Sequence, residues 1–93
     1  MSDLPAIENY GDYSSENYGV HSLRVVLPTI TLYYSYKTIV AFYTHETGRV
    51  CSENIWSSTT GKHLNKIEPN KPLRWGNEVF NKMLQDALQT HIV

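Results

Sequence analysis

The sequence predicts an α+β domain in which a small antiparallel sheet of about four strands carries a C-terminal helix packed on one face. The chain has 93 residues, the length of a single domain. Between residues 21 and 56, alternating apolar residues, many of them β-branched or aromatic, indicate strands. Near residue 79 the apolar period becomes that of a helix, and strands followed by a helix give a two-layer domain.

The expected strands cover residues 21–27, 29–36, 38–44 and 49–56. Residues 38–44 are apolar on both faces, so they form either a central strand covered on both sides or a strand that faces a partner chain. Gly48 suits the turn that precedes the last strand. The joint at Tyr36 and Lys37 has no Gly or Asn, which leaves a hairpin and a continuous bulged strand both open.

Two helices are expected after the strands. The first is short and ends at Asn65 or Ile67, and its N-cap is one of Ser57, Ser58, Thr59 and Thr60. The second carries one apolar stripe, made of Val79, Phe80, Met83, Leu84, Ala87 and Leu88. Asn77 is its expected N-cap, and Glu78 suits the first turn because a negative charge is favourable there.

The terminal helix, at about 14 residues and about 21 Å, covers one face of the sheet and not both. The apolar and tyrosine-rich second face then needs the N-terminal segment or another subunit as its cover. We therefore expect a homodimer at micromolar concentration.

Residues 1–17 are expected to form an acidic, tyrosine-rich arm, and residues 18–93 a single domain. Four acidic residues and no Lys or Arg give residues 1–19 a charge of −4; because the whole chain has a charge of −1, the remainder carries +3. The motif Glu-Asn-Tyr-Gly occurs twice in this region, at residues 8–11 and 16–19. Such an arm is either a solvated tail or a segment that folds back or docks a basic partner.

Several function classes lack the residues they require. Cys51 is the single cysteine, and the four histidines have no ligand spacing, so neither a disulfide nor a metal site is expected. Residues 59–62, TTGK, lack the first glycine of a phosphate loop and the Ser or Thr after its lysine. We expect no cofactor and no enzyme activity. No apolar run or signal peptide indicates a membrane or secretion, so a cytoplasmic location is expected.

The densest polar run, residues 53–65, is the best candidate for a binding site. Basic and aromatic residues mix from Trp56 to Trp75, a composition that suits single-stranded nucleic acid. The alternative is that both tryptophans close the core where the helix meets the sheet. The candidate binding residues, for a protein partner or a nucleic acid, are Tyr18, Trp56, Thr59, Thr60, Lys62, His63, Asn65, Lys66, Arg74 and Trp75.

Residues 33–42, YYSYKTIVAF, and residues 53–65, ENIWSSTTGKHLN, together resemble short proteins of unknown function from bacteriophages and other mobile elements. The shared pattern is an aromatic-rich SYxTxVA strand followed by a WSxTTGKHLN segment. The resemblance covers roughly residues 15–67. It implies a small cytoplasmic accessory protein of an infected or element-bearing prokaryote, and it carries over no catalytic residue.

Two functions are therefore expected from the sequence. The first is a non-enzymatic accessory protein that binds a host or defence complex, for example as an inhibitor. Tyrosine richness favours it, because tyrosine gives a large contact area at a low entropic cost. The second is a nucleic-acid-binding module that uses the region from Lys62 to Trp75.

Overall fold

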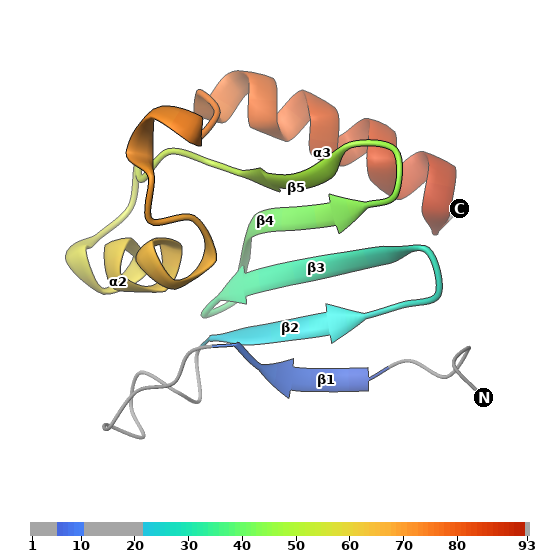
Figure 1. The fold of residues 1–93 in the computed structure, drawn as a ribbon, viewed down its shortest axis with the longest axis horizontal. Helices are drawn as coiled ribbons and strands as arrows, with labels where there is room; N and C mark the ends of the chain where they lie inside the picture. Colours follow the sequence, from blue (N-terminus) through green and yellow to red (C-terminus); the bar gives the residue numbers. More distant parts are fainter. Residues whose placement is uncertain (1–5, 11–21, 93) are drawn as a thin grey trace.

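The computed structural model describes residues 6–10 and 22–92 (Figure 1). They form one antiparallel sheet in the order β1-β2-β3-β4-β5, so each strand pairs with its neighbours in sequence. The elements are β1 (Ala6–Asn9), β2 (Leu23–Val26), β3 (Ile30–Ser35), β4 (Thr38–Thr44), β5 (Gly48–Cys51), α2 (Ser58–Ile67), the 3₁₀ turn η1 (Lys71–Leu73) and α3 (Asn77–His91).

The α+β class is confirmed, but the sheet has five strands rather than about four. The additional strand, β1, lies within residues 1–17, which we expected to form an arm outside the domain. It pairs antiparallel with β2, placing Ile7 opposite Val25 and Glu8 opposite Arg24. Glu8 Oε1 accepts a hydrogen bond from Arg24 Nε at 2.7 Å, and this bond raises the pKa of the Arg24 guanidinium. The rest of the expected arm and most of the repeat lie outside the described residues.

The interior strand β4 is buried on both faces in its middle. Phe42 belongs to a cluster on the α3 side with Leu32 and Val50, and its ring centroid lies 5.9 Å from that of Phe80. Ala41 belongs to a second cluster on the α2 side, with Cys51, Leu64 and Ile67. A register shift between Tyr33 and Tyr34 leaves Val40 as the extra residue of a bulge, and Val40 joins the α2-side cluster next to Ala41.

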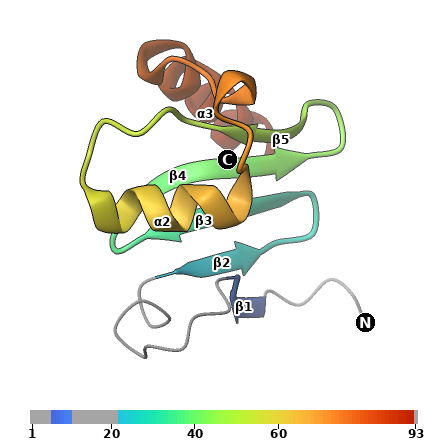
Figure 2. The same ribbon diagram turned by 60° about the vertical axis from the view of Figure 1, so that its left-hand side comes forward.

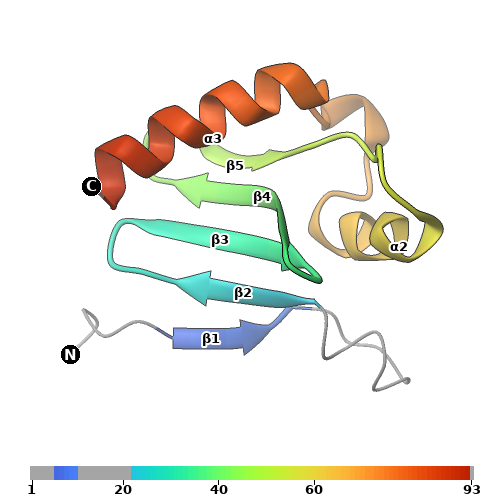
Figure 3. The same ribbon diagram turned by 180° about the vertical axis from the view of Figure 1, so that it is seen from behind.

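The C-terminal helix covers one face of the sheet, as expected, but the other face is also covered by a helix, which we did not expect. Figure 2 shows α2 in front of β3 and β4 with α3 behind them, and Figure 3 shows α3 across the opposite face. The sheet is thus held between two helices, and on the second face Tyr10 of the expected arm packs together with α2. Self-association stays a prediction, and the two-sided burial of β4 no longer supports it.

A tight turn joins β3 to β4. Of the two alternatives for this joint, the hairpin is therefore confirmed and the continuous bulged strand was wrong. Ser35 pairs with Thr38, which leaves Tyr36 and Lys37 as the loop. Tyr36 has a φ of 57°, a conformation that costs a residue with a Cβ about 1–2 kcal/mol. Glycine is usual at such positions. The Tyr36 ring instead packs on His63, with centroids 5.8 Å apart.

The predicted cap is confirmed for α2 but not for α3. Ser57 is the N-cap of α2, and its Oγ accepts a hydrogen bond from Thr60 N at 3.3 Å. Gly76, not Asn77, precedes α3, and Glu53 Oε2 accepts from Asn77 N at 3.0 Å. The α3 stripe is largely confirmed, with Phe80 and Ala87 buried, but Val79 is exposed. Within the described residues, no helix has both the length and the apolar character needed to span a membrane.

Replacing Ser57 tests whether its side chain caps and stabilises the N-terminus of α2. We expect Ser57→Ala to lower the free energy of unfolding by about 1 kcal/mol, because the Thr60 N–H loses its acceptor. The matched control is Ser58→Ala, at the adjacent exposed position inside the helix. Urea unfolding followed by circular dichroism measures both changes. Equal stabilities of the two variants would contradict the assignment of Ser57 as the cap.

Candidate functional site

A buried polar cluster connects β3 to α2. Ser35, Thr60 and His63 are all buried, and His63 is 0% exposed. Ser35 Oγ donates to Thr60 Oγ1 at 3.0 Å and lies 2.6 Å from His63 Nδ1. Because a hydroxyl has one proton, the proton between Ser35 and His63 belongs to the histidine. The imidazole thus donates to Ser35 and cannot withdraw the serine proton through Nδ1.

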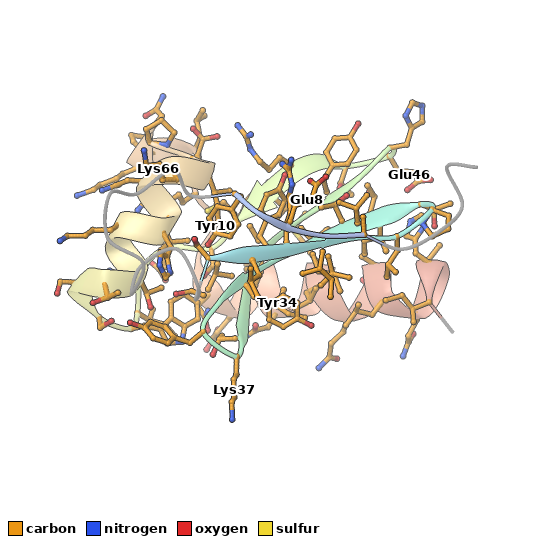
Figure 4. The ribbon with its side chains drawn as sticks, turned by 90° about the horizontal axis from the view of Figure 1, so that it is seen from below. Glu8, Tyr10, Tyr34, Lys37, Glu46 and Lys66 are labelled. Carbon is orange, nitrogen blue, oxygen red and sulfur yellow. The ribbon has the colours of Figure 1, made fainter. Side chains whose placement is uncertain are left out.

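Aromatic side chains surround this cluster. The Tyr10 ring meets His63 edge-on at 6.3 Å and Tyr33 at 5.5 Å. Its hydroxyl donates to the backbone carbonyl of Tyr34 at 2.9 Å. Figure 4 looks at the sheet from the β1 edge and shows Tyr10 on one side and Tyr34 on the side of α3. These contacts make His63 a packed part of the fold, with no exposed surface for a ligand.

Cys51, the single cysteine of the chain, is equally enclosed. Its side chain is buried, and this burial raises the pKa of the thiol to about 11. The thiol is therefore neutral at physiological pH and a poor nucleophile. Among residues 6–10 and 22–92, no group of three or more His, Cys, Asp or Glu side chains could hold a metal ion.

A polar cavity of about 460 Å³ opens beside α2. Its lining residues are Glu53, Asn54, Gly61, Asn65, Lys71 and Arg74. Arg74 is held in place from two directions: its Nε donates to the Glu68 carbonyl at 3.0 Å, and its Nη2 donates to Asn65 Oδ1 at 2.8 Å. A guanidinium has five N–H donors, so these two bonds fix the group and leave donors for a ligand.

The glycine of the TTGK run has a packing role in this cavity. A Cβ built at Gly61 would stand 3.0 Å from Asn54 Nδ2, closer than ordinary contacts allow. Asn54 organises the loop before α2, since Nδ2 donates to the Ser57 carbonyl and Oδ1 accepts from Trp56 N. Gly61 thus lets this loop approach the helix. This close approach explains the glycine without a bound phosphate.

The two tryptophans do not close the core, contrary to one of our alternatives. Trp56 is 38% exposed and Trp75 is 44% exposed. Their segments run side by side, because Trp75 N donates to the Cys51 carbonyl and Glu53 N donates to the Trp75 carbonyl, both at 2.8 Å. Lys62 and Lys66 are exposed on α2, and Figure 4 shows Lys66 at this end of the molecule.

The structure brings together only part of the predicted site. Asn65 and Arg74 meet in the cavity, whereas Thr60 and His63 belong to the buried cluster, and Thr59 is half-buried in the first turn of α2. Tyr18 lies outside the described residues. The residues that sequence reasoning missed are Ser35, Glu53, Asn54 and Lys71. Glu53 and Asn54 stood in the dense polar run, and Lys71 stood in the basic and aromatic stretch from Trp56 to Trp75, but nothing marked Ser35.

Comparison with known proteins places the chain in a family. Residues 6–81 match a family of unknown function, DUF8033. The chain belongs to this family. The match includes β1, the whole sheet, α2 and the cavity residues, and it ends inside α3. No curated protein and no solved structure matches the chain.

A methyl group at Gly61 tests the link between this glycine and the Trp56 loop. In Gly61→Ala, a gain of up to about 1 kcal/mol in helix propensity is offset by displacement of Asn54. We expect a net change in the free energy of unfolding of less than about 1 kcal/mol, together with a shifted Trp56 backbone N–H resonance, because Asn54 Oδ1 accepts from that N–H. Gly76→Ala is the control, because its Cβ would meet nothing closer than 3.9 Å. A full stability gain with an unmoved Trp56 backbone N–H resonance would refute this packing role.

Proposed function

We propose that this chain is a small non-catalytic binding protein of phage or mobile-element type. It acts in the cytoplasm of the prokaryotic host by occupying a surface of a host or defence complex. The exposed apolar side chains at one end of the fold carry the proposal.

Five large apolar side chains are exposed on two adjacent segments, the β5–α2 loop and residues 73–79. They are Ile55, Trp56, Leu73, Trp75 and Val79. Backbone hydrogen bonds between Trp75 and residues 51 and 53 keep the two segments together. Tryptophan is enriched at the centres of protein interfaces, where it supplies much of the binding energy. A chain that leaves both of its tryptophans exposed here has a ready contact surface.

The same end is basic. It carries Lys62, Lys66, Lys71 and Arg74, four of the eight Lys and Arg residues in the chain. The nearby carboxylates are engaged within the fold, since Glu53 accepts from Asn77 N and Glu68 Oε2 accepts from Asn70 N. Such a charge distribution favours an acidic partner surface and speeds association with it.

A second candidate function is binding of single-stranded nucleic acid. The spacing of Lys62 and Lys66 favours it, because residues four apart share one face of a helix. Phosphates could contact that face while bases stack on an indole. The exposed aliphatic residues Ile55, Leu73 and Val79 favour a protein partner instead, since they offer no stacking surface.

Capture experiments with tryptophan variants test the first function. The tagged chain is incubated with nuclease-treated lysate of a prokaryotic host, and retained proteins are quantified by mass spectrometry. We expect Trp56→Ala and Trp75→Ala to reduce the retained partner at least about tenfold, the cost of losing an interface anchor. Tyr43→Ala is the matched control, because Tyr43 has the same 44% exposure as Trp75 but lies on β4. Retention by the tryptophan variants at the wild-type level would defeat the proposal.

Salt dependence tests the second function. If Lys62 and Lys66 contact phosphates, oligothymidylate affinity falls steeply as salt rises, and the double change to Gln reduces the slope of log affinity against log salt by about 1.4, about 0.7 for each contact. Arg74 is left unchanged, because its hydrogen bonds to Asn65 and to the Glu68 carbonyl contribute to the fold. Lys37→Gln and Lys82→Gln together give a control of equal charge at other sites. Fluorescence anisotropy measures the affinity, and no binding at about 50 mM salt would exclude this function.

A further inference from the structure

We propose that the cavity beside α2 binds a side-chain carboxylate, from an Asp or Glu in an acidic segment of the protein partner. This inference rests on the proposed function and specifies the partner chemistry at the same end of the fold. The cavity, at about 460 Å³, has room for a short side chain together with its hydration.

Arg74 is the central recognition group. Its bonds to the Glu68 carbonyl and to Asn65 Oδ1 set the plane and direction of the guanidinium before a ligand arrives. A positioned guanidinium binds a carboxylate with two parallel hydrogen bonds. Less side-chain entropy is then lost on binding, because the group is already ordered.

The remaining lining residues fit a single negative charge. Lys71 and Arg74 contribute two positive charges and Glu53 one negative charge, which leaves one positive charge in excess. One oxygen of Glu53 is occupied by the Asn77 N–H, so this carboxylate is tied to the start of α3. The side-chain amide of Asn54 also faces the cavity, and its fixed position comes from its bonds to the Trp56 and Ser57 backbone.

The surroundings favour a peptide carboxylate over a phosphate of a nucleic-acid strand. The Glu53 carboxylate lines the cavity and would repel the successive phosphates of a polyanion. Ile55 follows Asn54 in the sequence and Leu73 precedes Arg74, and both are exposed and suit the apolar residues of an acidic peptide. An acidic side chain placed beside apolar ones is therefore the chemistry that this site fits.

Two-dimensional NMR of the ¹⁵N-labelled full chain tests this inference. The probes are the capped peptides acetyl-Leu-Glu-Leu-Glu-amide and acetyl-Leu-Gln-Leu-Gln-amide, which differ only in their carboxylates, and a short oligothymidylate. Titration runs to about 5 mM, because a contact of this size supports millimolar affinity. The reporters are the Arg74 Nε–H and the side-chain amides of Asn54 and Asn65.

We expect the Glu peptide, and not the Gln peptide, to shift these three reporters. Arg74→Lys should weaken binding of the Glu peptide about tenfold, although the charge is kept, because the paired hydrogen bonds are lost. Arg24→Lys is the matched control, since it makes the same change at the ion pair between β1 and β2. The same two variants are also compared in the capture experiment, where only Arg74→Lys should lower retention.

Equal shifts from the Glu and Gln peptides, or reporters that respond only to oligothymidylate, would overturn the carboxylate assignment. If tryptophan-dependent capture persists and is insensitive to Arg74→Lys, the binding function stands and this inference fails. If tryptophan variants capture the partner normally while the Glu peptide still shifts the reporters, the cavity binds carboxylate but the proposed contact surface is wrong.

Discussion

Burial of β4 on both faces is the constraint on which the rest of this structure depends. Val40, Ala41 and Phe42 are all fully buried, so a helix on one face alone would leave apolar surface in water. The chain meets this requirement after β5 by placing α2 on one face and α3 on the other. To do so it must pass from one side of the sheet to the other between residues 68 and 76, and Figure 1 shows this passage at the end of β5.

The candidate binding surface is a result of that passage. A segment that changes faces at the edge of a sheet cannot bury all of its own side chains. Here η1 and Trp75 lie along the end of β5, where two backbone hydrogen bonds hold Trp75, while Arg74 reaches back to the end of α2. The cavity is the space between this segment, the β5–α2 loop and α2. The element that completes the core thus also creates the exposed indole and the anchored guanidinium.

The sequence predicted those parts of the fold that a local period determines. Residues 38–44 coincide with β4, and α3 follows the predicted stripe, because repeated apolar spacing reports a buried face directly. It did not predict β1, whose sequence AIEN holds a single strong strand former and depends on pairing with β2. Tyr36 in a turn was also missed, since its positive φ is offset by a distant contact with His63.

The candidate site was less predictable because it, too, depends on contacts between residues far apart in the sequence. The polar run at residues 53–65 marked the correct region, and Asn65 and Arg74 were both named. Their hydrogen bond, the approach of Asn54 to Gly61 and the burial of His63 all depend on tertiary packing that no local pattern contains. The sequence also could not decide whether the two tryptophans are buried or exposed, because an indole suits a core and an interface equally well.

The meander order of the sheet also has consequences for folding. Since every strand pairs with its neighbours in sequence, three of the four pairings can form by closing connections of two or three residues, and such local topologies fold fast. The packing of α3 is not local, because its Phe80 contacts Phe42, which lies far away in the sequence. Amide protons of β3 and β4 should therefore exchange only on global unfolding, whereas α3 can detach in a smaller opening and bare one apolar face of the sheet.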